Sequence, residues 1–249
     1  MTPIAARLFE RAVHKRWITP RITIFGDPYQ FGYKPTLSTI DCLLCLQHYV
    51  LSMLDNSNID GIHAALIDFS KAFDQVNQEK AAKKYNHFLE SPSIKRWLYD
   101  FTVGRRQRLI WQGTPLDYQN IDRGCSQGTV GGPGIFSMYT DDLRPLDSMS
   151  KNFKYSDDTN CLSPCMKNPS HQEKERFSKE IQTIVDWAVE NGLSLNTEKS
   201  KHIRFCLNRM PCCECVYADE HFVSVNQAKI LGVIFQSDRS FRQHCRLFF

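Results

Sequence analysis

Two adjacent aspartates, Asp157 and Asp158, stand between short arms in which apolar and polar residues alternate. This pattern predicts a β-hairpin over residues 154–162, with both carboxylates at its turn. Adjacent carboxylates repel each other, so a bound cation is their natural partner. An Asp-Asp pair alone is weak evidence, however, because aspartate is common in turns.

A third carboxylate, Asp68, ends an apolar run over residues 63–67 that we expect to form a buried strand. Carboxylates at the ends of neighbouring strands can hold two divalent cations about 3.5–4 Å apart. Magnesium prefers oxygen ligands and is readily shared between carboxylates and substrate phosphates. The three aspartates therefore predict two-metal phosphate chemistry, and they leave a nuclease or a phosphatase open beside a polymerase.

A second Asp-Asp pair, Asp141 and Asp142, is a competing candidate. It lies at the end of the helical periodicity of residues 135–143 and precedes Pro145, which helps to end a helix. We therefore interpret this pair as part of a helix end and prefer the pair in the hairpin.

The bulk properties are those of an ordinary globular chain. Its 249 residues are 42% hydrophobic, and the net charge of +4 suits a polyanionic partner without requiring one. No signal peptide and no apolar stretch of roughly 20 residues is present, so we expect a soluble intracellular protein without a membrane partner. We interpret the ten cysteines as plain thiols; a metal site is the alternative for Cys161, Cys165, His171, Cys212, Cys213, Cys215 and His221.

Periodicity predicts a mixed α/β chain with antiparallel hairpins rather than strict strand–helix alternation. Helices are expected over residues 1–13, 38–54, 78–89, 135–143 and 169–190. Besides the aspartate hairpin, extended segments are expected over residues 63–67, 104–113, 202–207, 222–225 and 230–235.

Six sequence blocks stand in a recognisable order: residues 30–33 (QFGY), 68–76 (DFSKAFDQV), 126–129 (SQGT), 155–158 (YSDD), 191–196 (NGLSLN, with Lys199 after it) and 230–233 (ILGV). Each block is weak alone. Together they span nearly the whole chain and resemble the fingers segment, palm motifs and primer grip of reverse transcriptases from non-LTR (LINE-like) retrotransposons. The resemblance implies an α/β (α+β) fold, a right-hand polymerase palm with an antiparallel sheet and partial helical fingers.

The resemblance also implies an activity, which is RNA-directed DNA synthesis from a primer 3′-hydroxyl. Two Mg²⁺ ions, with Mn²⁺ as an alternative, would be bound by Asp68, Asp157 and Asp158, of which the first two are the stronger expected ligands. Lys199 would protonate the departing pyrophosphate. The implied partners are an RNA template, a DNA primer and deoxynucleoside triphosphates.

Further roles follow from the same resemblance. Phe73 would lie under the sugar and exclude a 2′-hydroxyl, and the other substrate-binding residues would be Gln127, Gly128 and Tyr155. Nucleic-acid contacts are expected from Arg105, Arg106, Arg108, Leu231 and Gly232. Plain structural roles are the alternatives: core packing for Phe73, a solvated surface for Lys199, and a charged edge strand for the arginines.

Relative to this family, the chain begins after the basic fingers strand and ends just past the primer grip, so we expect a domain truncated at both ends, without a thumb. Over residues 1–249 we expect partial fingers (1–60), palm (61–80), fingers (81–123), palm (124–238) and the start of a thumb (239–249). A catalytically silent remnant that at most binds nucleic acid is the alternative function. A mobile-intron or telomerase-like lineage is disfavoured by the QFGY block. Elements of this type typically act in the nucleus, although no clear basic localisation run is present.

Overall fold

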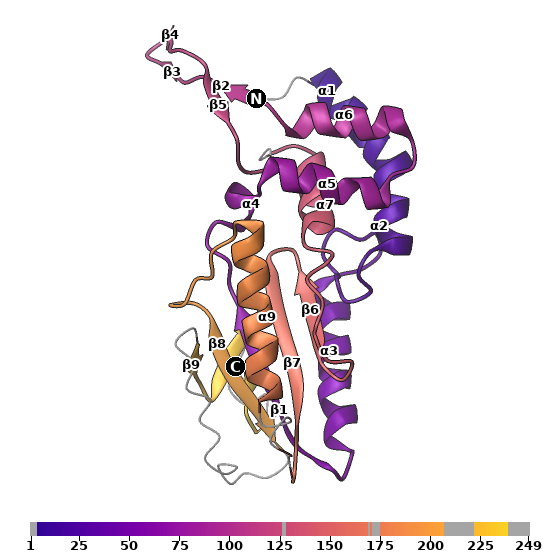
Figure 1. Cartoon of the computed structure of the whole chain (residues 1–249), viewed down its shortest axis with the longest axis vertical. Coiled ribbons are helices and arrows are strands. Elements are labelled where there is room, and N and C mark those ends of the chain that lie inside the picture. The colour runs from indigo at the N-terminus through magenta and orange to yellow at the C-terminus, as the bar shows by residue number, and fades with distance from the viewer. Residues whose placement is uncertain (1–3, 126–127, 169, 171–174, 207–221, 239–249) are drawn as a thin grey trace, which may run out of the picture.

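The computed structural model describes residues 4–125, 128–168, 170, 175–206 and 222–238. A helical part lies above a part that is built on a β-sheet (Figure 1). Among the described residues, this central sheet has five strands in the order β6-β7-β1-β8-β9. Adjacent strands in this sheet are antiparallel, except that β8 and β9 are parallel. The strands are β1 (Ile59–Ile67), β6 (Lys151–Tyr155), β7 (Asp158–Met166), β8 (Lys201–Cys206) and β9 (Val223–Ser224).

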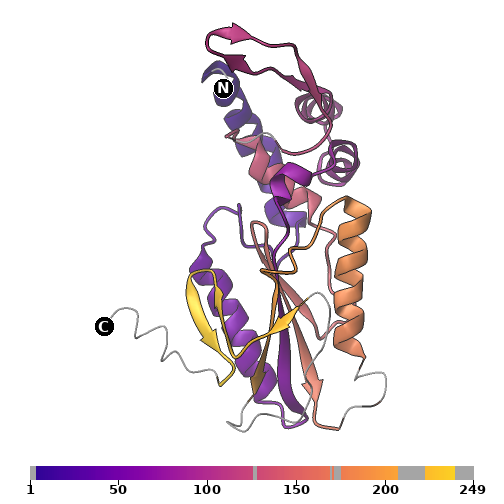
Figure 2. The ribbon, with the colours of Figure 1, turned by 90° about the vertical axis from the view of Figure 1, so that its left-hand side faces the viewer.

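Both faces of the sheet are covered, which explains why β1 is buried along most of its length. Helix α9 (Arg176–Asn191) packs on one face, while α3 (Thr39–Leu54) and a hairpin of β10 (Gln227–Ile230) and β11 (Val233–Gln236) lie on the other (Figure 2). Side chains alternate across a strand. Ala65 and Ile67 therefore join the core that contains α9, whereas Ile62 and Ala64 join the core that contains α3. Along the chain, β1, the helices that follow it, β6, β7, α9 and β8 form a β-α-β-β-α-β arrangement.

Helix α3 confirms the prediction for residues 38–54, including its cap. Ser38 forms a capping box with Asp41, whose Oδ2 accepts a hydrogen bond from the Ser38 backbone N at 2.7 Å. Leu46, Val50 and Leu54 are buried against the sheet. The position of α3 is therefore set by a local cap and by one apolar face.

The helical part is formed by two segments of the chain. Helix α1 (Ile4–Val13) continues through the π-helical turn η1 (His14–Ile18) into α2 (Thr19–Phe25). Glycines in helix α7 (Gly131–Tyr139) allow it to approach this π-helical turn closely, because a Cβ at Gly131 would lie 2.9 Å from Nε2 of His14. The remaining helices are α4 (Ala72–Gln75), α5 (Gln78–Phe88) and α6 (Pro92–Thr102).

An arm projects from the helical part (Figures 1 and 2). Its base pairs β2 (Arg105–Gln107) with β5 (Gln119–Ile121), and its tip pairs β3 (Ile110–Trp111) with β4 (Thr114–Pro115). The extended structure expected over residues 104–113 is thus confirmed as one half of this arm.

The prediction of one continuous strand over residues 230–235 is wrong, because Ile230 ends β10 and β11 begins at Val233. Leu231 and Gly232 form a turn with φ of 46° and 91°, and β10 and β11 pair across it. The residues on both sides of Gly232 are apolar, so the run of residues 230–235 resembles one continuous strand and conceals the turn. The conformation required at Gly232 is one that glycine adopts without steric cost.

Two expected helices have different bounds. The helix predicted over residues 135–143 begins earlier and ends at Tyr139, since the glycines before Ile135 are themselves helical. The helix predicted over residues 169–190 begins at Arg176 and is capped by Gly192, with φ of 71°. Several predictions fall on residues outside the described part. They include the first part of this helix (169 and 171–174, which include His171), the cluster from Cys212 to His221, and the start of a thumb over 239–249. In the described part, no helix combines the length and the apolar character needed to cross a membrane.

Candidate active site

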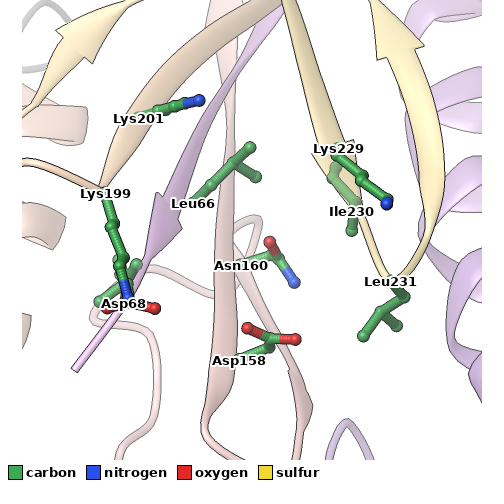
Figure 3. A pocket seen from close by; sticks show the side chains of 10 residues that line it. Leu66, Asp68, Asp158, Asn160, Lys199, Lys201, Lys229, Ile230 and Leu231 are labelled. Carbon is green, nitrogen blue, oxygen red and sulfur yellow. The ribbon is translucent and has the colours of Figure 1, made fainter. Parts of the chain in front are cut away.

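The register of the sheet brings Asp68 and Asp158 together. Strands β1 and β7 pair Leu66 with Asn160 and Ile67 with Thr159. Asp68 follows the last residue of β1 and Asp158 is the first of β7, so the next step of this register places them opposite each other. Both side chains line one pocket of about 180 Å³ (Figure 3).

Three lysines share the pocket with these carboxylates. Lys199 extends toward Asp68, while Lys201 comes from β8 and Lys229 from β10 (Figure 3). Sequence reasoning named Lys199 but missed the other two. Lys201 is the exposed first residue of β8, and Lys229 alternates with buried residues along β10, as a residue on any solvated strand face would. Only the packing of the β10–β11 hairpin near the sheet reveals that both line the pocket.

Asp157 lies in the adjoining turn. Tyr155 pairs with Asp158, so Ser156 and Asp157 form the two-residue link between β6 and β7. The predicted hairpin is confirmed, but only Asp157 lies in its turn, because Asp158 is already the first residue of β7. Burial raises the pKa of Asp158, and the negative charges of Asp157 and Asp68 raise it further. The three carboxylates therefore share one electrostatic environment, in which a cation would relieve their repulsion.

The donors fit a hard divalent cation, because carboxylate and amide oxygens are what magnesium prefers. Asp68, Asp158 and Asn160 offer such atoms within one pocket. Asp157 is not among the residues that line this pocket. In the described part of the chain, no three His, Cys, Asp or Glu side chains are grouped closely enough to hold a metal ion.

The competing pair, Asp141 and Asp142, has structural partners. Asp141 forms an ion pair with Arg144 at 3.0 Å. Asp142 binds Lys84 at 2.7 Å and accepts a hydrogen bond from Trp187 Nε1 at 3.0 Å. Both carboxylates therefore serve to hold the end of α7 against neighbouring elements.

Phe73 is half-buried at the junction of the two parts of the molecule. Its ring is stacked on Phe136, with ring centroids 4.4 Å apart. The ring of Tyr33 lies in a T-shaped arrangement with it, with centroids 6.4 Å apart. Core packing is thus one established role of this residue. Gly128 has φ of 71°, a backbone conformation that favours glycine, and Gln127 lies outside the described residues.

The segment of residues 27–33 lies along β6. Phe31 N donates to Lys154 O at 2.7 Å, and Lys154 N donates to Tyr29 O at 2.8 Å. Gly32 approaches the turn so closely that a Cβ there would lie 2.3 Å from Ser156 N. The QFGY block therefore supports the hairpin that carries Asp157 and Asp158, a role that no pattern within the block indicates.

The arginines of the arm divide into two kinds. Arg105 donates to the backbone carbonyls of Thr102, at 3.2 Å, and Gly124, so its guanidinium helps to hold the base of the arm. Arg106 and Arg108 lie over the ring of Tyr118, at 5.6 and 5.0 Å from its centroid. These exposed arginines and the aromatic ring beside them could contact phosphates and bases.

A sheet that presents opposed carboxylates beside a tight hairpin, with helices behind it, is the palm of a nucleic-acid polymerase. Residues 1–235 match the family described as reverse transcriptase (RNA-dependent DNA polymerase), and the chain belongs to this family. Polymerases of this family generally use divalent metal ions.

Relatives among curated proteins agree with this assignment. The chain is 24% identical to the RNA-directed DNA polymerase from mobile element jockey of Drosophila funebris, over 98% of this chain and 27% of the relative. It is 23% identical to the probable RNA-directed DNA polymerase from transposon X-element of Drosophila melanogaster, with the same coverage. The chain thus spans about a quarter of the length of these relatives.

Solved structures share the fold. A telomerase from Candida tropicalis, in complex with a fragment of telomeric RNA, superposes with a TM-score of 0.62 at 10% identity, over 95% of this chain and 36% of that chain. The RNA-dependent RNA polymerase of a human picobirnavirus, an insertion-loop deletion mutant, gives 0.54 at 15% identity, over 96% and 40%. At such low identity these likenesses show the fold alone.

Proposed function

We propose that this chain is the polymerase domain of a non-LTR retrotransposon reverse transcriptase, which joins deoxynucleotides to a primer 3′-hydroxyl on an RNA template. The observation that carries the proposal is the shared pocket of Asp68 and Asp158, with Asp157 in the adjoining turn. The raised pKa of Asp158 supports it, because that shift reflects neighbouring negative charge as well as burial.

Asp68, Asp157 and Asp158 would hold two Mg²⁺ ions, with Mn²⁺ as an alternative. Such ions activate an attacking hydroxyl and stabilise a leaving oxygen when they are bound. Lys199 extends into the same pocket and would deliver a proton to departing pyrophosphate. Lys201 and Lys229 would bring positive charge to the phosphates of the primer strand.

Other residues would position the substrates. Phe73 would exclude a ribose 2′-hydroxyl, and Gln127, Gly128 and Tyr155 would border the incoming nucleotide. Leu231, at the tip of the β10–β11 hairpin, lines the pocket and with Gly232 would support the primer end. The assignment of residues 1–60 and 81–123 to fingers, and of 61–80 and 124–238 to palm, is part of the same proposal.

Primer extension on an RNA template with a DNA primer tests the proposal. Purified protein is assayed with Mg²⁺ and with Mn²⁺, beside Asp68→Asn and Asp157→Asn. Asp55→Asn is a matched control, since Asp55 is exposed at the end of α3 and belongs neither to the proposed site nor to the arm. We expect incorporation by the wild type and the control, and a loss of about a hundredfold or more in the two site variants. Folded wild-type protein that incorporates nothing would identify a silent remnant instead.

A further inference from the structure

A hydrogen bond joins the QFGY block to the turn between β6 and β7. The hydroxyl of Tyr33 lies 2.6 Å from Oγ of Ser156, and either atom can be the donor. Ser156 directly precedes Asp157 in the two-residue link of the hairpin. No sequence motif pairs these two residues, which come together only in the folded chain.

Both residues of this contact have unusual backbone conformations. Tyr33 has φ of 63° and Ser156 has φ of 62°, in the left-handed region that residues with a Cβ seldom adopt. Such conformations persist where the surroundings hold them in place, and they gather at functional sites. At Ser156, the surroundings include the close backbone of Gly32 as well as the Tyr33 hydroxyl.

The ring of Tyr33 is itself held by aromatic neighbours. It meets Phe73 edge-on at 6.4 Å, and Phe73 is stacked on Phe136 of α7. Phe136 is fully buried in the core that also contains residues of α9 and β1. Tyr33 therefore connects this buried aromatic core, through its ring, to the turn before Asp158, through its hydroxyl.

We propose that Tyr33 is a positioning residue for the cation site: its hydroxyl fixes Ser156 and thereby sets Asp157 and Asp158 relative to Asp68. This inference rests on the proposed function, since it concerns cation binding by those carboxylates. It adds a residue that acts through the turn and that need not touch the cation or the substrates.

Binding of Mn²⁺ alone tests this role without any need for activity. Free Mn²⁺ is counted by electron paramagnetic resonance during titration of the wild type, Tyr33→Phe, Ser156→Ala and the double variant. A net hydrogen bond is worth about threefold to tenfold in an equilibrium constant, so each single variant should bind Mn²⁺ more weakly by about that factor. The double variant should be no weaker than either single variant, because both remove the same contact.

Tyr99→Phe is the matched control. Tyr99 is 44% exposed, against 43% for Tyr33, and its hydroxyl donates to Glu79 at 3.3 Å on the surface. This variant should bind Mn²⁺ as the wild type does. Thermal unfolding without metal should be equal for Tyr33→Phe and Tyr99→Phe, which separates positioning of the site from a general loss of stability.

Two further results would overturn the inference in distinguishable ways. Wild-type affinity in Tyr33→Phe, together with weakened binding in Asp68→Asn, would leave the cation site intact and remove Tyr33 from it. Equal Mn²⁺ binding by the wild type and Asp68→Asn would reject the cation site itself, and the role of Tyr33 with it. Additive losses in the double variant would show that Tyr33 and Ser156 act separately, which also contradicts the inference.

Discussion

Nζ of Lys154 lies 2.8 Å from Oδ2 of Asp27, and both side chains are almost fully buried. Lys154 also donates to the carbonyls of Thr140 at 2.7 Å and Leu143 at 3.2 Å. Burial lowers the pKa of Lys154, while the charge of Asp27 acts in the opposite direction. The pair therefore holds three parts of the chain together: the segment before α3, the end of α7 and strand β6, which leads into the aspartate turn.

Replacing Lys154 with Met should therefore destabilise the fold strongly. The change removes the cation that lies 2.8 Å from the buried carboxylate of Asp27, which keeps its ion pair with Arg144 at 3.2 Å. Breaking one side of a buried pair costs about 3–5 kcal/mol. Urea unfolding measures this cost, and the exposed pair of Arg96 and Asp100 supplies a control, since Arg96→Ala should change stability by no more than about 1 kcal/mol. A loss in Lys154→Met as small as in the control would contradict the prediction.

Phe73→Val should weaken discrimination against ribonucleotides. The smaller side chain removes the ring that is stacked on Phe136 and opens space beside the proposed sugar position. We expect the ratio of kcat/KM for deoxynucleotide over ribonucleotide to fall by about tenfold or more, as differences of a few methylene groups in a pocket allow. Steady-state primer extension with each nucleotide measures the ratio. An unchanged ratio, from protein with normal extension of deoxynucleotides, would assign Phe73 to core packing alone.

The buried histidines His63 and His202 should make the fold sensitive to acid. Their ring nitrogens are 2.9 Å apart, and burial is the main cause that lowers the pKa of His63 to about 3 and of His202 to about 4. Their pKa values are lower in the folded than in the unfolded chain, so the unfolded chain binds more protons below pH 6.5. The free energy of unfolding should therefore fall as pH drops from about 6.5 toward 4, by up to about 1.4 kcal/mol per pH unit for each histidine.

Urea unfolding at pH 7 and pH 5 measures this loss. His63→Gln should reduce the difference between the two pH values, because one buried titrating group is removed. His48→Gln is the control, since His48 is exposed on α3 and should leave the difference unchanged. An equal pH dependence in His63→Gln and the wild type would show that other groups are responsible.

Arg106→Ala and Arg108→Ala should weaken nucleic-acid binding in a salt-dependent way. Both guanidinium groups are exposed over Tyr118 on the arm. If each arginine neutralises one phosphate, each substitution should reduce the slope of log affinity against log salt by about one. Fluorescence anisotropy with a labelled RNA–DNA hybrid at several salt concentrations gives the slope. Arg96→Ala should keep the wild-type slope, and the same slope in the arm variants would remove the arm from the interface.

Local signals in the sequence predicted several elements well. Ser38 and the apolar stripe after it predicted α3, and the alternation around Asp157 and Asp158 predicted the β6–β7 hairpin. These succeed because caps and short-range periodicity depend on neighbours within a few residues. The turn at Leu231 and Gly232 was missed, because apolar residues flank it on both sides and resemble one continuous strand.

The amino-acid sequence was enough to name Asp68, Asp157 and Asp158 as candidate ligands, since a strand end and a hairpin pattern mark them locally. What surrounds them became visible only in the folded chain. Tyr33 reaches Ser156, and Lys229 lines the pocket of Asp68, through contacts between segments far apart in the chain. Such contacts depend on strand register and on how a hairpin packs beside a sheet, and a shift of one residue turns each side chain to the opposite face. Periodicity shows which face of a strand is polar, but it cannot show what that face will meet.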